Sequence, residues 1–131
     1  MSTVKLIEYE EASDEVRAVY DDIMATRKID WINNFWKSLA NHPQVLKSTW
    51  ASLKATMGEG ALDPMVKEMI YIAVSTANSC EYCIHSHTAA ARARGMSDAM
   101  HEELMQVIAM ASATNALAIG MQVPVDDVFK A

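Results

Sequence analysis

Two cysteines and a histidine lie close together near the middle of the chain. Cys80 and Cys83 are three residues apart, and His87 follows Cys83 by four residues and Cys80 by seven. In an α-helix, side chains at these spacings share one face, so the two thiols and the imidazole are expected to lie together. A helix that begins near Cys80 also stabilises a thiolate, because the unpaired N–H groups and the dipole of its N-terminus favour an anion. The pattern predicts a reactive dithiol beside an imidazole.

The spacing of the cysteines also bears on the bond that they could form. Helical Cβ atoms three residues apart are separated by about 5–6 Å, whereas a disulfide joins Cβ atoms at about 3.8 Å. We therefore expect oxidation of Cys80 and Cys83 to distort the first helical turn and the bond to be easily reduced. Such a bond is typical of a dithiol that cycles and not of a structural bridge.

A carboxylate on the preceding segment is expected to reach the imidazole. Glu68 lies about 15 Å along its own helix from the turn at Asn78, and His87 lies about 12 Å from the same turn on the returning helix. If the two helices form an antiparallel hairpin, Glu68 and His87 end at a similar height. The carboxylate could then orient the imidazole directly or through a water, and His87 could take the proton of Cys83. We predict a proton relay from Glu68 through His87 to Cys83, with Cys80 closing the disulfide.

The apolar spacing of the remaining chain predicts an all-α protein of about six helices. With 131 residues, four glycines and three prolines, the chain has too few turn residues for a β-sandwich or barrel. The expected helices cover residues 13–26, 31–39, 43–57, 65–78, 80–94 and 98–121, with Ser13, Ser79 and Ser97 as N-caps and Gly95 ending the fifth helix. The segment 70–74 is rich in β-branched residues and could be a buried strand, but the Asp63–Pro64 start signal favours a helix.

Composition and charge exclude several classes of protein. Hydrophobic residues are 51% of the chain and charged residues 21%, so a disordered tail or a disulfide-stapled miniprotein is excluded. The net charge of −6 has no basic stripe to offset it, so no nucleic-acid partner is expected. The N-terminus lacks the features of a secretory signal, and polar residues interrupt the apolar stretch 104–123, so no membrane span is expected. We expect a cytoplasmic protein, in which a close cysteine pair suggests redox or metal chemistry.

The order and spacing of these residues resemble a known family. Glu68, the C-x-Y-C-x-x-x-H pattern from Cys80 to His87, the G-x-G-x-L-D-P approach from Gly58 to Pro64, and Gly95 are similar to the alkylhydroperoxidase D-like branch of the carboxymuconolactone decarboxylase family. The length of the chain and the lack of a linker predict a single helical domain over residues 1–131, with N-terminal helices in 1–41. The resemblance covers a family-like core at about 42–120 and implies that it is an all-α helical bundle. It also implies homo-oligomers, either trimers or hexamers, and the small-residue run 111–120 could face the chain's own core or a neighbouring subunit.

The resemblance further implies an activity and residue roles. Cys83 would be the thiol that attacks peroxide, Cys80 its resolving partner, and Glu68 and His87 the proton relay. The chain departs from the best-known members at Tyr82, where they can carry a second histidine, and its cysteine pair argues against muconolactone decarboxylation. We expect a thiol-dependent enzyme that reduces hydroperoxides, as a peroxidase, or disulfides, as a disulfide reductase. No flavin or nicotinamide signature is visible, so no cofactor is expected and the electrons would come from a thiol or lipoyl-type donor protein.

Three other interpretations stay open at the level of sequence. Cys80, Cys83 and His87 could bind zinc, with Glu68, His85 or His101 as a fourth ligand, although structural zinc sites usually draw ligands from two separated knuckles. A thioredoxin fold also places C-x-x-C at a helix start, but the later part of the chain lacks the strands that it needs. A non-catalytic helical oligomer would keep the fold without using the thiols.

Overall fold

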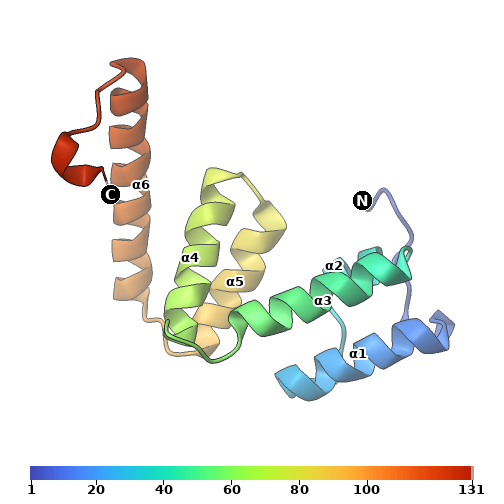
Figure 1. Cartoon of the computed structure of the whole chain (residues 1–131). Helices are drawn as coiled ribbons and strands as arrows, with labels where there is room; N and C mark the ends of the chain where they lie inside the picture. Colours follow the sequence, from blue (N-terminus) through green and yellow to red (C-terminus); the bar gives the residue numbers. More distant parts are fainter. Residues whose placement is uncertain (131) are drawn as a thin grey trace. The chain divides into compact units, whose positions relative to one another are not determined.

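The computed structural model describes residues 1–130, and all of its regular structure is helical (Figure 1). The elements are a 3-10 turn Tyr9–Glu11, α1 (Asp14–Arg27), α2 (Asn34–Leu39), α3 (Pro43–Met57), α4 (Pro64–Ala77), α5 (Glu81–Ala93), α6 (Asp98–Gly120) and a 3-10 turn Asp127–Phe129. The prediction of an all-α protein with about six helices is confirmed, and segment 70–74 lies inside α4. A thioredoxin fold is wrong for this chain, because residues 1–130 contain no strand.

Short-range signals place most helix ends where the sequence predicts them. The side chains of Ser13, Asp63 and Ser97 accept hydrogen bonds from backbone N–H groups in the first turns of α1, α4 and α6. Pro43 and Pro64 occupy the first positions of α3 and α4, where the missing N–H has no consequence. The helix boundaries are therefore set mainly by local chemistry.

The start of α5 differs from the prediction. Ser79 is not its N-cap, because it adopts the left-handed backbone conformation with φ of 56° and closes the end of α4. The N–H of Cys80 donates to the carbonyl of Ser75 at 2.9 Å, and the N–H of Ser79 donates to that of Thr76 at 3.2 Å, which is the pattern of a Schellman motif. Cys80 is consequently the N-cap of α5. Gly95, with φ of 103°, ends α5 as predicted.

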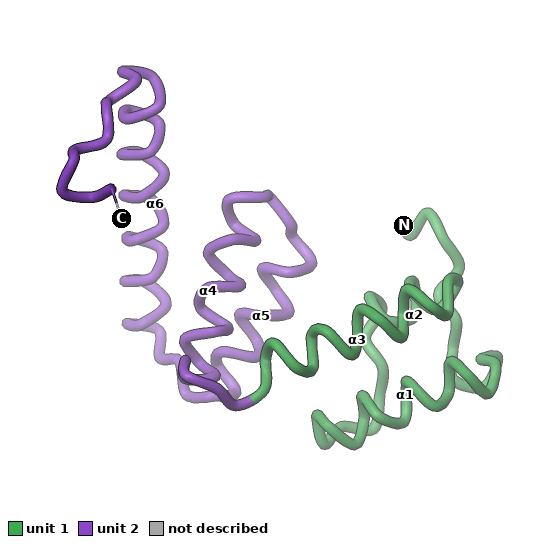
Figure 2. The backbone as a smooth tube through the Cα atoms, viewed as in Figure 1, with its two compact units in different colours: residues 1–58 green, residues 59–131 purple. Residues whose placement is uncertain are grey.

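The chain divides into two compact units, and the first covers residues 1–58 (Figure 2). The rings of Trp36 and Trp50 meet edge to face at 5.4 Å, and the Arg27 guanidinium lies over both. Both tryptophans are buried. The core of this unit consists of Ala12, Val16, Val19, Tyr20, Ile23, Ile32, Trp36, Ala40, Leu46 and Trp50.

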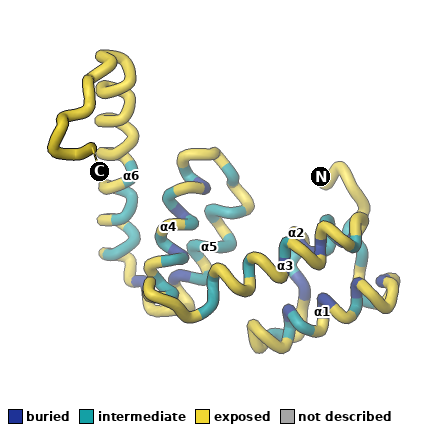
Figure 3. The backbone as a smooth tube through the Cα atoms, in the orientation of Figure 1, coloured by how far each residue is buried: buried dark blue, intermediate teal, exposed yellow. Residues whose placement is uncertain are grey.

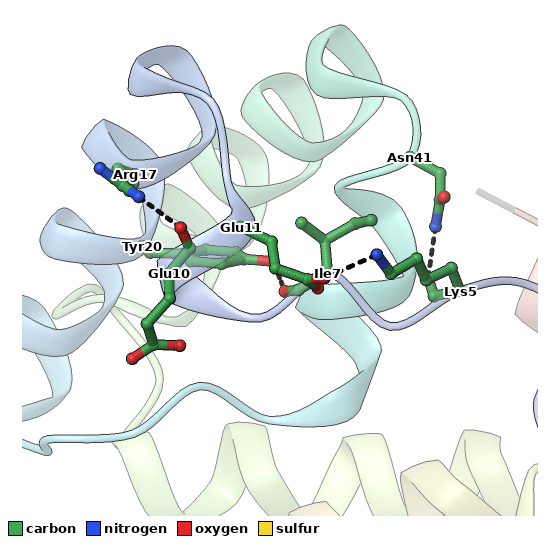
Figure 4. Close-up of polar contacts among 7 residues, drawn as sticks. All are labelled: Lys5, Ile7, Glu10, Glu11, Arg17, Tyr20 and Asn41. Carbon is green, nitrogen blue, oxygen red and sulfur yellow. Dashed lines mark hydrogen bonds and ion pairs between the residues drawn. The ribbon is translucent and has the colours of Figure 1, made fainter.

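Hydrogen bonds attach the N-terminal segment to the first unit (Figure 4). The Tyr20 hydroxyl donates to the carbonyl of Ile7 at 2.8 Å, and the Asn41 amide donates to that of Lys5 at 2.7 Å. Arg17 donates to the carbonyl of Glu10 at 2.6 Å. These side chains satisfy backbone carbonyls of the segment that precedes α1.

The second unit covers residues 59–131 and holds the residues singled out for chemistry. Helices α4 and α5 lie side by side as an antiparallel pair (Figure 1). Ile72, Ala91 and Met96 form its buried centre, and methionines from α4 and α6 pack around them. Beyond Ile108 the side chains of α6 are exposed (Figure 3). No helix within residues 1–130 combines the length and the hydropathy that a transmembrane span requires. A single domain over residues 1–131 stays a prediction.

Candidate redox site

Cys80 and Cys83 form a disulfide at the N-terminus of α5, with their Cα atoms 5.3 Å apart. The Sγ atom of Cys80 accepts a hydrogen bond from the backbone N–H of Cys83 at 3.3 Å, as an N-cap side chain does. The first backbone hydrogen bond of the helix, from Ile84 to the carbonyl of Cys80, is intact at 2.9 Å. The expectation of a distorted first turn is therefore wrong, because Cys80 lies outside the helix. Easy reduction of the bond stays a prediction.

Glu68 and His87 are in direct contact. The Oε2 atom of Glu68, on α4, lies 2.7 Å from Nδ1 of His87, on α5, so the predicted proximity of the two residues is confirmed. The Glu68 residue is only 5% exposed. With an ionised carboxylate, which only accepts hydrogen bonds, Nδ1 is the donor, and in a neutral imidazole Nε2 is then the acceptor. The nitrogen that can accept a proton is therefore the one that Glu68 does not contact.

Arg94 is a second partner of the buried carboxylate, and the sequence interpretation missed it. Its Nε atom lies 3.8 Å from Oε1 of Glu68. The positive side chain of Arg94 is therefore next to the carboxylate oxygen that His87 does not contact. A buried carboxylate is tolerated when it is paired. Arg94 is the C-cap residue of α5 and follows His87 by seven residues, so it continues the helix face on which His87 lies. That spacing is the signal that could have identified it.

Tyr71 completes the surroundings of His87. Its ring stacks on the imidazole with a centroid distance of 3.7 Å and an interplanar angle of 18°. Tyr71 follows Glu68 by three residues on α4, so both present side chains to the same neighbour. The sequence interpretation used this spacing for the cysteines but not for α4.

The other candidate ligands do not join this cluster. His85, considered above as a zinc ligand, is exposed on α5, and Tyr82 is also exposed. Among residues 1–130, no three histidine, cysteine, aspartate or glutamate side chains are arranged to hold a metal ion. The ligand set considered for zinc is thus not assembled in this structure, where both sulfurs are bonded to each other.

The fold and the site together define a class of protein, an all-helical chain whose paired helices carry two cysteines, a histidine and a buried glutamate. The sequence profile of the Carboxymuconolactone decarboxylase family matches residues 43–124, and the chain belongs to this family and to its alkylhydroperoxidase D-like branch. The crystal structure of the alkylhydroperoxidase AhpD core from Rhodospirillum rubrum is similar over 100% of this chain and 98% of that one, with a TM-score of 0.92 and 55% sequence identity.

Two curated proteins are similar to this chain over a smaller share of their own length than the crystal structure is. The chain is 35% identical over 63 residues to "Uncharacterized protein 4 in cox locus" of Paracoccus denitrificans, which is 48% of this chain and 54% of that protein. It is 26% identical over 105 residues to the (R)-2-haloacid dehalogenase of Pseudomonas putida, which is 80% of this chain and 35% of that protein. The chain therefore matches about half of one relative and about a third of the other.

Proposed function

We propose that this protein is a thiol-dependent peroxidase that reduces a hydroperoxide with the Cys80–Cys83 pair, or that it reduces a disulfide by the same dithiol chemistry. Membership of the alkylhydroperoxidase D-like branch supports an oxidoreductase of this general type. The observation that carries the finer proposal is the 2.7 Å contact of Glu68 with His87, one helical turn from a cysteine of the disulfide.

In the first step of the proposed cycle, Nε2 of His87 takes the proton of the reduced Cys83 thiol. Cys83 lies one turn before His87 on α5, and hydrogen bonding of Nδ1 to Glu68 holds the ring in the tautomer whose Nε2 accepts. The Cys83 thiolate attacks the terminal peroxide oxygen and the O–O bond breaks. The leaving alkoxide takes the proton and departs as an alcohol, so Cys83 becomes a sulfenic acid.

In the second step Cys80 resolves the sulfenic acid. The Cys80 sulfur attacks the Cys83 sulfur, water leaves, and a disulfide joins the two cysteines. Two electrons have then passed from the thiols to the peroxide. The disulfide bond between these residues corresponds to the oxidised state of this cycle.

An external dithiol closes the proposed cycle. A thiol or lipoyl-type donor protein attacks the disulfide, forms a mixed disulfide and leaves oxidised, which returns both cysteines to thiols. Two electrons pass from the donor's sulfurs to the cysteine sulfurs, and from these to the peroxide, so the cycle needs no bound redox cofactor. The cycle fits a reducing compartment such as the cytoplasm, where thiol donors are maintained.

We also propose that the chain works as a homo-oligomer, a trimer or a hexamer. The second half of α6 is exposed on every side and is rich in alanine, with large apolar residues such as Leu117 at 60% exposure and Ile119 at 76%. A helix that is apolar all round is normally buried, and a short helical segment without packing is marginal in water. Other copies of the chain would supply the missing cover.

Mass spectrometry of the reduced full-length chain after limited hydrogen peroxide tests the redox proposal. Wild type should form an intramolecular link between Cys80 and Cys83. Cys80→Ser should accumulate a sulfenic acid on Cys83 that a dimedone-type reagent labels, and Cys83→Ser should show none on Cys80. Absence of both the link and the label would refute the proposal, and stoichiometric zinc in the purified reduced protein would favour the metal site instead.

A further inference from the structure

Tyr71 is an aromatic residue beside the proposed relay that has no part in the motif. It lies on α4, one turn after Glu68, and its ring covers the His87 ring at 3.7 Å with an interplanar angle of 18°. The His87 side chain is only 17% exposed, so this stack forms a substantial part of its enclosure. The two α4 residues contact the imidazole in different ways, one through an atom at its edge and one through its face.

The hydrogen bond to Glu68 is not enough to orient the imidazole. The outer torsion of a histidine side chain is broad and roughly two-fold, so the side chain itself does not select one ring plane. A single bond at Nδ1 fixes one atom and leaves the ring free to tilt about that contact. A flat ring held against the imidazole face removes this remaining freedom. Together the two contacts determine where Nε2 is directed.

We propose that Tyr71 is a positioning residue, whose aromatic face holds the plane of the His87 imidazole so that Nε2 is directed consistently toward the thiol that it deprotonates. The consequence for rate rests on the proposed function, whereas the effect on ring orientation does not. The contact involves the aromatic ring, so it is the ring and not the phenol hydroxyl that does this. Phenylalanine at position 71 should therefore preserve the orientation of the imidazole. Leucine, which has similar bulk but no planar face, should not preserve it.

Two measurements on the reduced full-length chain test this inference. The first is the rate of Cys80–Cys83 disulfide formation with hydrogen peroxide. Tyr71→Phe should stay within about twofold of wild type, and Tyr71→Leu should be slower by about tenfold, the upper range for loss of an aromatic pair. Ile70→Ala is the matched control. Ile70 is 48% exposed on α4, and because it is adjacent to Tyr71 in sequence, its side chain points to a different side of the helix.

The second measurement is the NMR signal of the His87 ring, which does not depend on activity. A stacked aromatic ring shifts the carbon-bound imidazole protons upfield. This shift should be present in wild type, Tyr71→Phe and Ile70→Ala, and lost in Tyr71→Leu, while far-UV circular dichroism confirms that each variant is folded.

The outcomes separate this inference from the proposed function. If wild type forms no disulfide with peroxide but keeps the upfield shift, which Tyr71→Leu loses, the proposed function fails and the stacking of Tyr71 on His87 stands. If wild type forms the disulfide and Tyr71→Leu forms it at the same rate, or if Tyr71→Leu keeps the wild-type His87 signal, the inference is overturned. A loss in Tyr71→Phe as large as that in Tyr71→Leu would also overturn it, because the hydroxyl would then be responsible.

Discussion

The Nδ1 atom of His87 lies 2.7 Å from the Oε2 atom of Glu68, and the two residues come from different helices of an antiparallel pair. The glutamate is buried, and it is 19 residues from its partner in sequence. The contact therefore exists only because α4 and α5 pack in this register. In the proposed cycle this contact fixes the tautomer of the histidine that serves as the base.

Substitution of the two relay residues should slow disulfide formation to different extents. His87→Ala removes the proposed base and is expected to lower the rate by about 10²–10⁴-fold. Glu68→Gln keeps a side chain of the same shape but weakens the orientation of the imidazole, and should lower the rate by about 10–100-fold. Stopped-flow measurement of peroxide-driven disulfide formation would give both values. The double variant should fall no further than His87→Ala, because the glutamate acts through the histidine; additive losses would contradict the relay.

Arg94 should contribute to the site mainly through charge. Arg94→Met removes the cation beside Glu68 and is expected to slow disulfide formation by about threefold, which corresponds to the modest energy of a half-exposed ion pair. The free energy of unfolding should change by less than about 1 kcal/mol. Arg92→Met is the matched control, since Arg92 is a neighbouring arginine on α5 that pairs with the exposed Asp98. Equal effects on rate in the two variants would show that Arg94 has no specific role.

Asp22 should make the stability of the first unit depend on pH. Its Oδ2 atom accepts a hydrogen bond from the Trp50 indole at 2.6 Å. This bond is the largest cause that holds the pKa of Asp22 below its usual value, and the hydrogen bonds from Lys54 are the second. The unfolded chain therefore binds the proton more readily than the folded one. The resulting stability is present in full above pH of about 4, the ordinary range of aspartate, and is lost as the pH falls through the folded pKa.

Urea unfolding of two variants would check the role of Asp22. Asp22→Ala leaves the buried Trp50 N–H without its acceptor and should lower the free energy of unfolding by about 1–3 kcal/mol at pH 7. Asp22→Asn keeps an acceptor and should lose less. The difference between wild type and Asp22→Asn should be constant from pH 7 to pH 5 and shrink below about pH 4. A difference that grows on acidification would have the wrong sign for this explanation.

Leu117 should be important for assembly. Leu117→Lys places a charge on the uncovered half of α6 and is expected to shift the protein toward smaller species in light scattering, because a buried unpaired charge is strongly disfavoured. Gln106→Lys adds the same charge at an exposed polar position earlier on α6 and should leave the mass unchanged. A monomeric wild type would remove the basis for this prediction.

Much of this protein is predictable from local sequence, and the physical reason is that the signals act over a few residues. Proline at the start of α3 and α4, the caps Ser13 and Ser97, and Gly95 define helix ends through backbone chemistry that needs no distant partner. The spacing of Cys83 and His87 places them on one face of any helix. The prediction that Glu68 approaches His87 also succeeded, because two straight helices joined by a tight turn have a calculable register.

Other features were decided only by tertiary structure. The stack of Tyr71 on His87 and the pairing of Arg94 with Glu68 depend on side-chain rotamers and on how two helices pack, which residue types and spacing leave open. Ser79 has the residue type of a helix cap, yet the hydrogen bonds that close α4 place it in the left-handed conformation and transfer the cap to Cys80. Where one helix ends directly before the next begins, the backbone hydrogen bonds of both helices together determine which residue is the C-terminal cap of the first and which is the N-cap of the second.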